Sequence, residues 1–334
     1  MKTIALTGSP LTKFDIGWVD DASRSYYLAD RSNARVVVID IDRVEYSHSL
    51  GEGLFTGAAA TGATSGPNGV AVLHDLNQVW AGDGDSTVKI IDLESRKLVD
   101  SIHTGGTKRV DELAHSDKHQ IVLVANDQEP IPFASLISTH AGHEIVKKIQ
   151  FPQATNGMHQ PVWDAGTGCF YLPVTEVDGN KALGEIVSID PDTMKVVSRY
   201  PVHECQPAGL AIGPRHELCI GCSGAAIAAG FSPRSLIMDL KSGAIVANVT
   251  EVGGSDEVWY NPGDDHYYLA AAWMSGGSVL GVINAKDRSW IENIPTAAGS
   301  HSVAADARTN RIFVPTTPSQ AYPQGGIAVF EVTD

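Results

Sequence analysis

The chain has 334 residues, of which 39 are Asp or Glu, 24 are Lys or Arg and 4 are Cys, so its formal net charge is −15. A chain this acidic repels nucleic-acid phosphates, and four cysteines over this length do not make a disulfide framework. Hydrophobic residues make up 43% of the sequence, which is typical of a globular protein and excludes intrinsic disorder.

The N-terminus carries one Lys and an apolar stretch that is too short for a secretory signal, whose apolar region spans about 7–15 residues. No window approaches the roughly 18 apolar residues that cross a membrane. We therefore expect a cytoplasmic protein with no membrane or nucleic-acid partner, as a monomer or small homo-oligomer.

Short β-rich runs follow one another along the whole chain, separated by Gly, Asp, Asn and Pro. In chain order they include 35–41, 88–93, 120–125, 185–191, 235–240 and 326–332. Runs of five to seven residues bounded by turn residues predict an all-β protein.

These runs belong to a unit that recurs seven times. Its first strand corresponds to residues 14–20, 67–73, 110–116, 158–164, 207–213, 255–261 and 300–306, so the units start 43 to 53 residues apart. Four-stranded units at this spacing predict a seven-bladed β-propeller that forms one domain over residues 1–334. The last unit supplies three strands, and we expect the N-terminal segment 2–8 to complete its blade and close the ring.

The segment 67–102, which contains PNGVAV and NQVWAGDGDSTVKIIDLESRKLVDSI, resembles YncE-like propellers and those of the gluconolactonase and streptogramin-lyase type. As a pattern, the resemblance covers all seven units. It implies the propeller fold and points to hydrolytic ring opening or elimination. Such propellers also include oxidoreductase subunits and binding scaffolds, so the function has to be argued from the site.

The first strand of each blade lines the central channel of a propeller, and the residue that enters this strand points toward the axis near one mouth. The seven units have Asp15, Asn68, Asp111, His159, Ala208, Asp256 and His301 at this position. Crowded carboxylates repel one another unless a cation compensates them, and carboxylates with imidazoles suit a divalent ion. The predicted metal ligands are Asp15, Asp111, His159, Asp256 and His301. The ion would be calcium, magnesium or a first-row transition metal, and a water-filled polar channel without a metal is the alternative.

Glu112, Gln160 and Glu257 each follow one of these positions. Because adjacent residues of a strand face opposite ways, we expect these three to form hydrogen bonds with neighbouring blades rather than face the axis. A supporting role beside the metal, or a role as a base, is the alternative.

For catalysis, we expect His159, His301 or Asp111 to transfer a proton while the metal polarises a carbonyl or activates water. Two long loops, 126–143 and 223–234, are expected to cover the same mouth of the channel and to form a partly apolar pocket for a small organic substrate. The candidate substrate-binding residues are Asn68, Gln206, Glu176, Trp273 and Phe133.

The cysteines and the charges at strand ends are given structural interpretations. Cys205 is either a buried apolar residue or a nucleophile activated by His203. Cys219 and Cys222 fit the spelling of a metal motif, but positions i and i+3 of a strand face opposite sides. Charged residues at strand ends, such as Arg35, are interpreted as solvated.

The sequence contains no P-loop, dinucleotide-binding, nucleophile-elbow or HExxH motif. The leading hypothesis is a metal-dependent enzyme acting on a small organic substrate, either a lactonase-like hydrolase or a lyase. A non-enzymatic propeller that binds a ligand or a protein, and a copper or iron oxidoreductase, are the alternatives.

Overall fold

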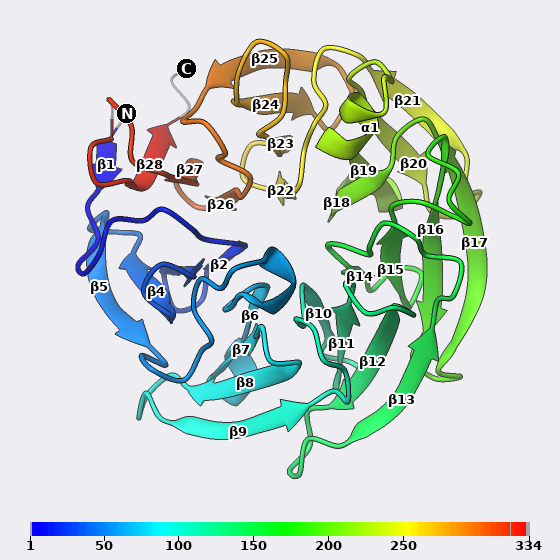
Figure 1. Cartoon of the computed structure of the whole chain (residues 1–334). Coiled ribbons are helices and arrows are strands. Elements are labelled where there is room, and N and C mark those ends of the chain that lie inside the picture. Colours follow the sequence, from blue (N-terminus) through cyan, green and yellow to red (C-terminus); the bar gives the residue numbers. More distant parts are fainter. Residues whose placement is uncertain (1, 321, 332–334) are drawn as a thin grey trace.

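Seven four-stranded antiparallel sheets surround a common axis in the computed structural model, which describes residues 2–320 and 322–331 (Figure 1). Each sheet is one blade, and in the first six blades the strands follow chain order from the axis outward. The all-β, seven-bladed propeller predicted from the sequence repeat is confirmed.

The first four blades are formed by consecutive strands. Blade 1 contains β2 (Gly17–Asp20), β3 (Ser25–Asp30), β4 (Arg35–Asp40) and β5 (Glu45–Leu50). Blade 2 contains β6 (Val70–Leu73), β7 (Gln78–Gly82), β8 (Thr87–Asp92) and β9 (Leu98–His103). Blade 3 contains β10 (Leu113–Ser116), β11 (Ile121–Asn126), β12 (Phe133–Ser138) and β13 (Ile145–Gln150). Blade 4 contains β14 (Val162–Asp164), β15 (Cys169–Val174), β16 (Leu183–Asp190) and β17 (Lys195–His203).

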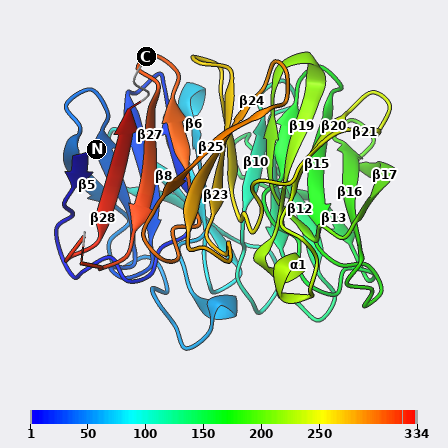
Figure 2. The same cartoon turned by 90° about the horizontal axis from the view of Figure 1, so that it is seen from above.

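The remaining three blades follow the same plan. Blade 5 contains β18 (Pro207–Ile212), β19 (Glu217–Cys222), β20 (Ser235–Asp239) and β21 (Ile245–Val249). Blade 6 contains β22 (Val258–Asn261), β23 (His266–Ala271), β24 (Val279–Asn284) and β25 (Trp290–Pro295). Blade 7 contains β26 (Ala304–Asp306), β27 (Arg311–Thr316), β28 (Gly326–Glu331) and the N-terminal β1 (Lys2–Ile4). A short helix, α1 (Gly224–Ala228), lies among the loops on one face of the disc (Figure 2).

Burial follows the position of each strand in its blade. The second strand β11 is buried at every residue, because both of its faces pack on neighbouring blades. The outer strand β17 alternates exposed and half-buried residues over most of its length, since one of its faces meets water. Among the described residues, no helix is long and apolar enough to cross a membrane.

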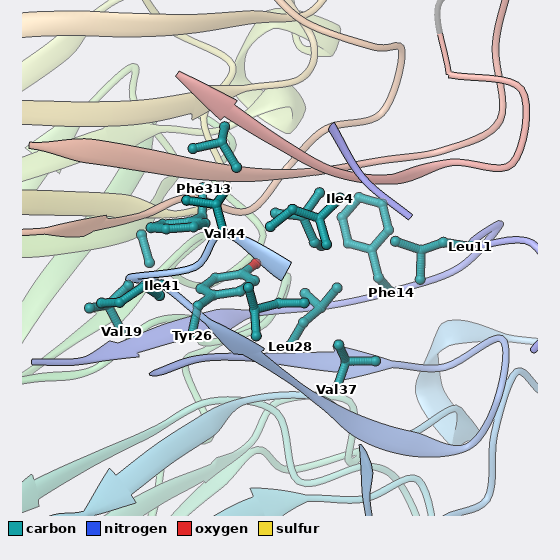
Figure 3. Packing of buried hydrophobic residues seen from close by; sticks show 14 residues of the cluster. Ile4, Leu11, Phe14, Val19, Tyr26, Leu28, Val37, Ile41, Val44 and Phe313 are labelled. Carbon is teal, nitrogen blue, oxygen red and sulfur yellow. The ribbon is translucent and has the colours of Figure 1, made fainter. Parts of the chain in front are cut away.

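The N-terminal strand closes the ring, as the sequence predicted. β1 pairs antiparallel with β28, with Ile4 opposite Ile327, so blade 7 combines both ends of the chain. Hydrophobic side chains fill the seam between blades 7 and 1 (Figure 3). There the ring of Tyr26 stacks on Phe313 at 5.2 Å between centroids. The closure is therefore both a strand pairing and a packed interface.

The expected long loop 126–143 is wrong in part, because residues Phe133–Ser138 form β12. The strand is apolar and buried, and its pairing with β11 outweighs the Gly and Pro residues around it that suggested a loop. The connection at the mouth is therefore limited to residues 127–132. The other expected loop, 223–234, contains α1.

Some charged residues at strand ends are buried rather than solvated. Arg35 is 4% exposed, and its Nε donates to Asp30 Oδ2 at 3.1 Å. Lys89 is similarly buried, with its Nζ 3.2 Å from Asp85 Oδ2. The interpretation of these two charges as solvated is wrong, because a buried charge is tolerated when an opposite charge is paired with it.

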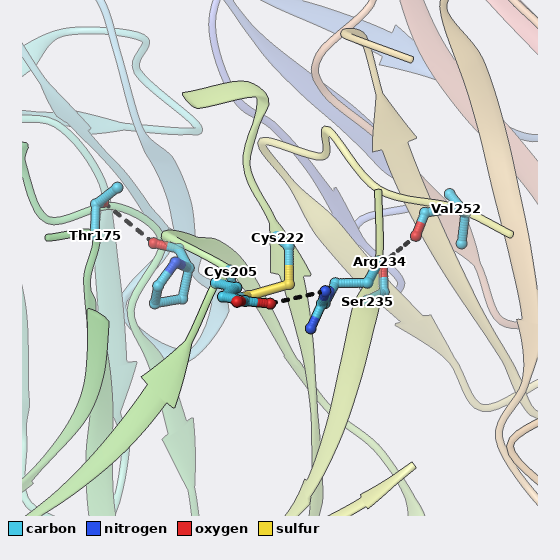
Figure 4. The surroundings of a disulfide bond; sticks show 8 residues. Thr175, Cys205, Cys222, Arg234, Ser235 and Val252 are labelled. Carbon is cyan, nitrogen blue, oxygen red and sulfur yellow. Dashed lines mark hydrogen bonds and ion pairs between the residues drawn. A yellow bond between two sulfur atoms is a disulfide. The ribbon is translucent and has the colours of Figure 1, made fainter. Parts of the chain in front are cut away.

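A disulfide joins Cys205 to Cys222, next to an ion pair between Glu204 and Arg234 (Figure 4). The hypothesis that Cys205 is a nucleophile is therefore wrong, because a disulfide sulfur has no thiolate to attack with. Cys219 is a free, fully buried thiol whose pKa is raised by burial. Of the two cysteines in the CxxC sequence, Cys222 forms the disulfide and Cys219 is a free thiol, so they do not pair with each other.

Candidate functional site

A cavity of about 150 Å³ lies at the mouth of the channel where the first strands of the blades begin. We call it the polar cavity; it is lined by Asp15, Arg31, Arg109, Asp111, Glu112, His159, Asp256, Trp273 and His301. All five predicted metal ligands and the predicted pocket residue Trp273 are among them. Residues at equivalent positions of the repeat therefore line one cavity, although they are up to 286 positions apart in the chain.

Arg31 occupies the part of the polar cavity nearest blades 1 and 2. Its guanidinium pairs with Asp15 and donates through Nε to Asn68 Oδ1 at 3.0 Å. Asn68 in turn donates to the backbone oxygen of Val110 at 2.7 Å and is fully buried. Burial alone would raise the pKa of Asp15, but Arg31 and His301 outweigh it and lower that pKa to about 2.

Arg109 serves two carboxylates on the blade 3 side. Its NH2 group lies 2.9 Å from Asp111 Oδ2 and 2.9 Å from Asp127 Oδ2. Burial opposes the charge of Arg109, yet Asp111 and Asp127 keep the pKa of the guanidinium well above its usual range. One guanidinium between two buried carboxylates leaves negative charge uncompensated.

His301 is held in place from several sides. Its Nδ1 donates to the backbone oxygen of Gly299 at 2.7 Å, and its Nε2 lies 3.5 Å from Asp15 Oδ1. The ring of Phe14 stacks on the imidazole at 4.6 Å between centroids. Burial lowers the pKa of His301, but Asp15 and Asp256 outweigh burial and raise it. The imidazole therefore carries a proton more readily than an ordinary histidine does.

Asp111, Glu112 and His159 form a cluster in which one potential ligand atom from each residue lies within 4.8 Å of the others. Asp111 and Glu112 are buried, and His159 is half-buried. Burial raises the pKa of Glu112 well above its usual range, and nearby Asp111 adds to the rise. Burial also raises the pKa of Asp111 despite the neighbouring Arg109. Such groups ionise when a cation or a partner compensates them, so the cluster is suited to hold a metal ion.

The other predicted substrate-binding residues lie outside the polar cavity. Gln206 and Glu176 line a separate hollow beside α1, where Gln206 Oε1 accepts from Asn156 Nδ2 at 3.1 Å. Phe133 belongs to β12 and is covered by Lys148, whose Nζ lies 5.2 Å from the ring centroid. Phe133 therefore does not form a wall of the polar cavity, because it is part of a strand and not of a loop at the mouth.

The residues that follow the start of the first strands face the channel, contrary to expectation. Glu112, Gln160 and Glu257 line a second cavity of about 260 Å³ deeper along the axis. The expected hydrogen bonds between blades are nevertheless present for two of them. Gln160 Oε1 accepts from Leu210 N at 2.8 Å, and Glu257 Oε2 accepts from Val303 N at 2.8 Å. The alternation was misjudged because the first residue of each unit lies before the regular strand begins.

Three charged residues of the site had not been predicted from the sequence, namely Arg31, Arg109 and Asp127. Arg31 and Asp127 follow directly after the second strands β3 and β11, whose ends lie at the same mouth as the starts of the first strands. Arg109 lies two residues before Asp111. Aligning the ends of the second strands would have indicated Arg31 and Asp127, whereas Arg109 lies outside both sets of equivalent positions.

The fold and the site together define a seven-bladed β-propeller with an ionisable cavity at one mouth of its channel. The sequence matches no protein-family model, and comparison with curated protein sequences finds no significant relative.

Among solved structures, the chain is similar to one from Kuenenia stuttgartiensis hydrazine synthase, with a TM-score of 0.75 and 12% sequence identity. That alignment covers 97% of this chain and 96% of the other. It is also similar to a chain of a mitotic checkpoint complex, with a TM-score of 0.71, 14% identity and coverage of 97% and 87%. At these identities the likeness concerns the propeller fold alone.

Proposed function

We propose that the protein is a metal-dependent enzyme that acts on a small organic substrate at the polar cavity. The observation that carries the proposal is the cluster of Asp111, Glu112 and His159, whose potential ligand atoms lie within 4.8 Å of one another. Two carboxylates and one imidazole form an oxygen-rich donor set. Such a set suits calcium, magnesium or manganese better than copper, which makes the oxidoreductase alternative less attractive.

The charge balance of the polar cavity supports a divalent ion. Four carboxyl groups line it, from Asp15, Asp111, Glu112 and Asp256, and a fifth, from Asp127, shares Arg109 with Asp111. Three cations oppose them, namely Arg31, Arg109 and a protonated His301, so the difference of 5 − 3 leaves two negative charges when every carboxyl group is ionised. One divalent cation would balance them without protonating any of these acids.

This assignment narrows the set of ligands expected from the sequence. Asp15 is engaged by Arg31 and His301, so it is proposed to orient those groups rather than bind the metal. His301, whose Nε2 lies 3.5 Å from Asp15 Oδ1, is proposed to donate a proton to a leaving oxygen. Arg31 lines the same cavity, so it would attract an anionic group of the substrate.

A bound divalent ion would supply Lewis acidity, by polarising a carbonyl or lowering the pKa of water. Together with a protonated His301, this favours a lactonase-like hydrolysis or an elimination, the two reactions implied by the resemblance noted above. We propose hydrolysis of a small lactone as the first reaction to test.

The proposal is tested by elemental analysis of the purified protein together with an assay on sugar lactones before and after chelation. We expect about one divalent ion per chain, and activity that is lost with EDTA and restored by the ion. His301→Gln should keep the ion but lower the rate about 10²- to 10⁴-fold. The exposed His140 serves as the matched control, and His140→Gln should change neither. Absence of both ion and chelator effect would contradict the proposal.

A water-filled channel in a non-enzymatic binding propeller is the second candidate. The observation that favours it is the pairing of Arg31 with Asp15 and of Arg109 with Asp111. These guanidinium groups already neutralise part of the negative charge that the metal is proposed to balance. This candidate predicts that the protein has the same thermal stability with and without divalent ions.

The disulfide bears on the compartment in which the protein acts. Disulfides persist mainly in oxidising compartments, so the Cys205–Cys222 bridge favours such a compartment over the expected cytoplasm. Alkylation of thiols before lysis of the native cells, followed by mass spectrometry, tests this. An oxidising location predicts that Cys205 and Cys222 escape alkylation, whereas a reducing one predicts that both are modified.

A further inference from the structure

The deeper cavity on the channel axis differs in character from the polar cavity. We call it the aromatic cavity; its walls come from the first strands of blades 1 to 6, and its aromatic residues are Trp18, His115, Trp163, Trp259 and Tyr260. The rest of the lining is mostly aliphatic, including Ile16 and Leu210. A cavity of about 260 Å³ with such walls has the size and polarity of a site for a small organic molecule.

Two buried acids form the polar part of this lining, Glu112 and Glu257. Glu257 is 1% exposed; its Oε2 accepts from Val303 N, while its Oε1 has no hydrogen-bond partner among the described residues. An unpartnered carboxyl oxygen in such surroundings is costly. A cation lying against the carboxylate of Glu257 would compensate its negative charge.

The aromatic side chains are placed to hold the organic part of such a cation. Trp259 lies two residues after Glu257 in the same first strand, so both side chains face the channel. Trp18 of blade 1 meets Trp259 of blade 6 edge to face, at 5.4 Å between ring centroids. They meet across blade 7, whose residue at the equivalent position is the small Ala304. Indole faces attract alkylammonium groups as well as apolar ones.

We propose that the aromatic cavity binds a small organic ammonium ion, with its charged nitrogen against Glu257 and its apolar part against the indole rings of Trp18 and Trp259. An inorganic cation has no apolar part to bury against the aromatic and aliphatic walls, and a neutral apolar ligand would leave Glu257 without a partner. The site is separate from the proposed metal cluster except for Glu112, which lines both cavities. It would exist whether or not the polar cavity is catalytic.

The probes for this site are choline and its uncharged carbon isostere, 3,3-dimethylbutan-1-ol, each titrated into the wild-type protein by isothermal calorimetry. The two probes have nearly the same shape, so a difference in affinity measures the effect of the charge. We expect choline to bind about tenfold more tightly, which corresponds to about 1.4 kcal/mol. Equal affinities, stronger binding of the isostere, or no binding of either probe would overturn the proposal.

Two variants locate the binding. Glu257→Gln keeps the shape of the side chain and should lower the affinity for choline about tenfold, to that of the isostere. Trp259→Ala should lower the affinity for both probes, because it removes an aromatic side chain from the wall of the cavity. The matched control is Trp290→Ala on the outer strand β25, which should leave both affinities unchanged. Choline affinity that survives both Glu257→Gln and Trp259→Ala, in variants with cooperative thermal unfolding, would place the probe elsewhere and overturn the proposal.

Discussion

The two cavities on the channel axis are both lined largely by the first strands of the blades, yet they differ in polarity and in charge. The polar cavity is lined by residues at the start of the strands, where acids, guanidiniums and imidazoles meet. The aromatic cavity is lined by residues further along, where Trp18, Trp163 and Trp259 accompany aliphatic side chains. Successive positions of the first strand line the channel at different depths. The same repeat can therefore form a charged cavity at the mouth and an aromatic cavity further along the axis.

Compensation of charge also differs between the two. In the polar cavity Asp15 and Asp111 each have a guanidinium partner. In the aromatic cavity Glu257 has no cationic partner among the described residues; the backbone N–H of Val303 and the side chain of Ser302 favour its charged form. The polar cavity is thus held together by ion pairs, whereas the aromatic cavity contains an acid that forms no ion pair with a described residue.

The largest effect is expected from removing a charge that the polar cavity depends on. Arg109→Met leaves Asp111 and Asp127 buried without their common partner, so the free energy of unfolding should fall by about 3–5 kcal/mol. Urea denaturation measures the loss. The exposed Arg96 provides a matched control, since Arg96→Met should change stability by less than about 0.5 kcal/mol. Similar effects of the two substitutions would mean that the buried network does not hold the polar cavity together.

A metal ion should stabilise the protein through the polar cavity and not through the aromatic one. At a MnCl2 concentration of about 100 times the dissociation constant, the free energy of unfolding should rise by about 2.7 kcal/mol. His159→Ala should abolish the rise, because it removes a proposed ligand. His115→Ala provides the control in the aromatic cavity and should leave the rise intact. A rise that persists in His159→Ala would disprove the assignment of this ligand.

The smallest effects concern pH, and they have opposite signs in the two cavities. The pKa of Asp15 is lowered in the folded protein to about 2, so its contribution of about 2 kcal/mol is present above pH 4 and is lost as the pH falls through about 2. Asp15→Asn should therefore be less stable than wild type at pH 5, and this difference in stability should disappear as the pH falls through about 2.

The pKa of Glu257 is instead raised by burial, so the folded state binds more protons than the unfolded state once the pH exceeds about 4.5. The contribution of Glu257 to stability then falls as the pH rises. The stability of Glu257→Gln should therefore increase relative to that of wild type over the same pH range. Thermal unfolding of wild type and of both variants from pH 2 to pH 8 measures the two differences in stability. Curves that run parallel to wild type would show that neither acid has a shifted pKa.

The fold could be predicted from the sequence because its signal is repeated. Each unit shows the same order of short strands and turns, and the missing fourth strand of the last unit indicated closure by the N-terminus. The strand β12 was misjudged because it follows Pro130 and Pro132 and carries small residues, Ala134 and Ser135, that also occur in loops. Its pairing with β11 is a long-range interaction that local composition does not reveal.

The candidate site could be predicted only in part. Equivalent positions of the repeat indicated which first-strand residues meet at the mouth, but Arg31, Arg109 and Asp127 lie outside those positions. Their role depends on how far each side chain reaches across the channel, which strand patterns do not encode. The disulfide was missed for the same reason: Cys205 and Cys222 are 17 residues apart and meet through the pairing of β18 with β19.

The proposed metal centre is tested most directly by anomalous diffraction from crystals soaked in MnCl2. We predict one strong anomalous peak in the polar cavity, within bonding distance of Asp111, Glu112 and His159, and none in crystals of His159→Ala treated in the same way. A cavity without a peak in the wild-type crystals, or a peak that is unchanged in His159→Ala, would contradict the assignment.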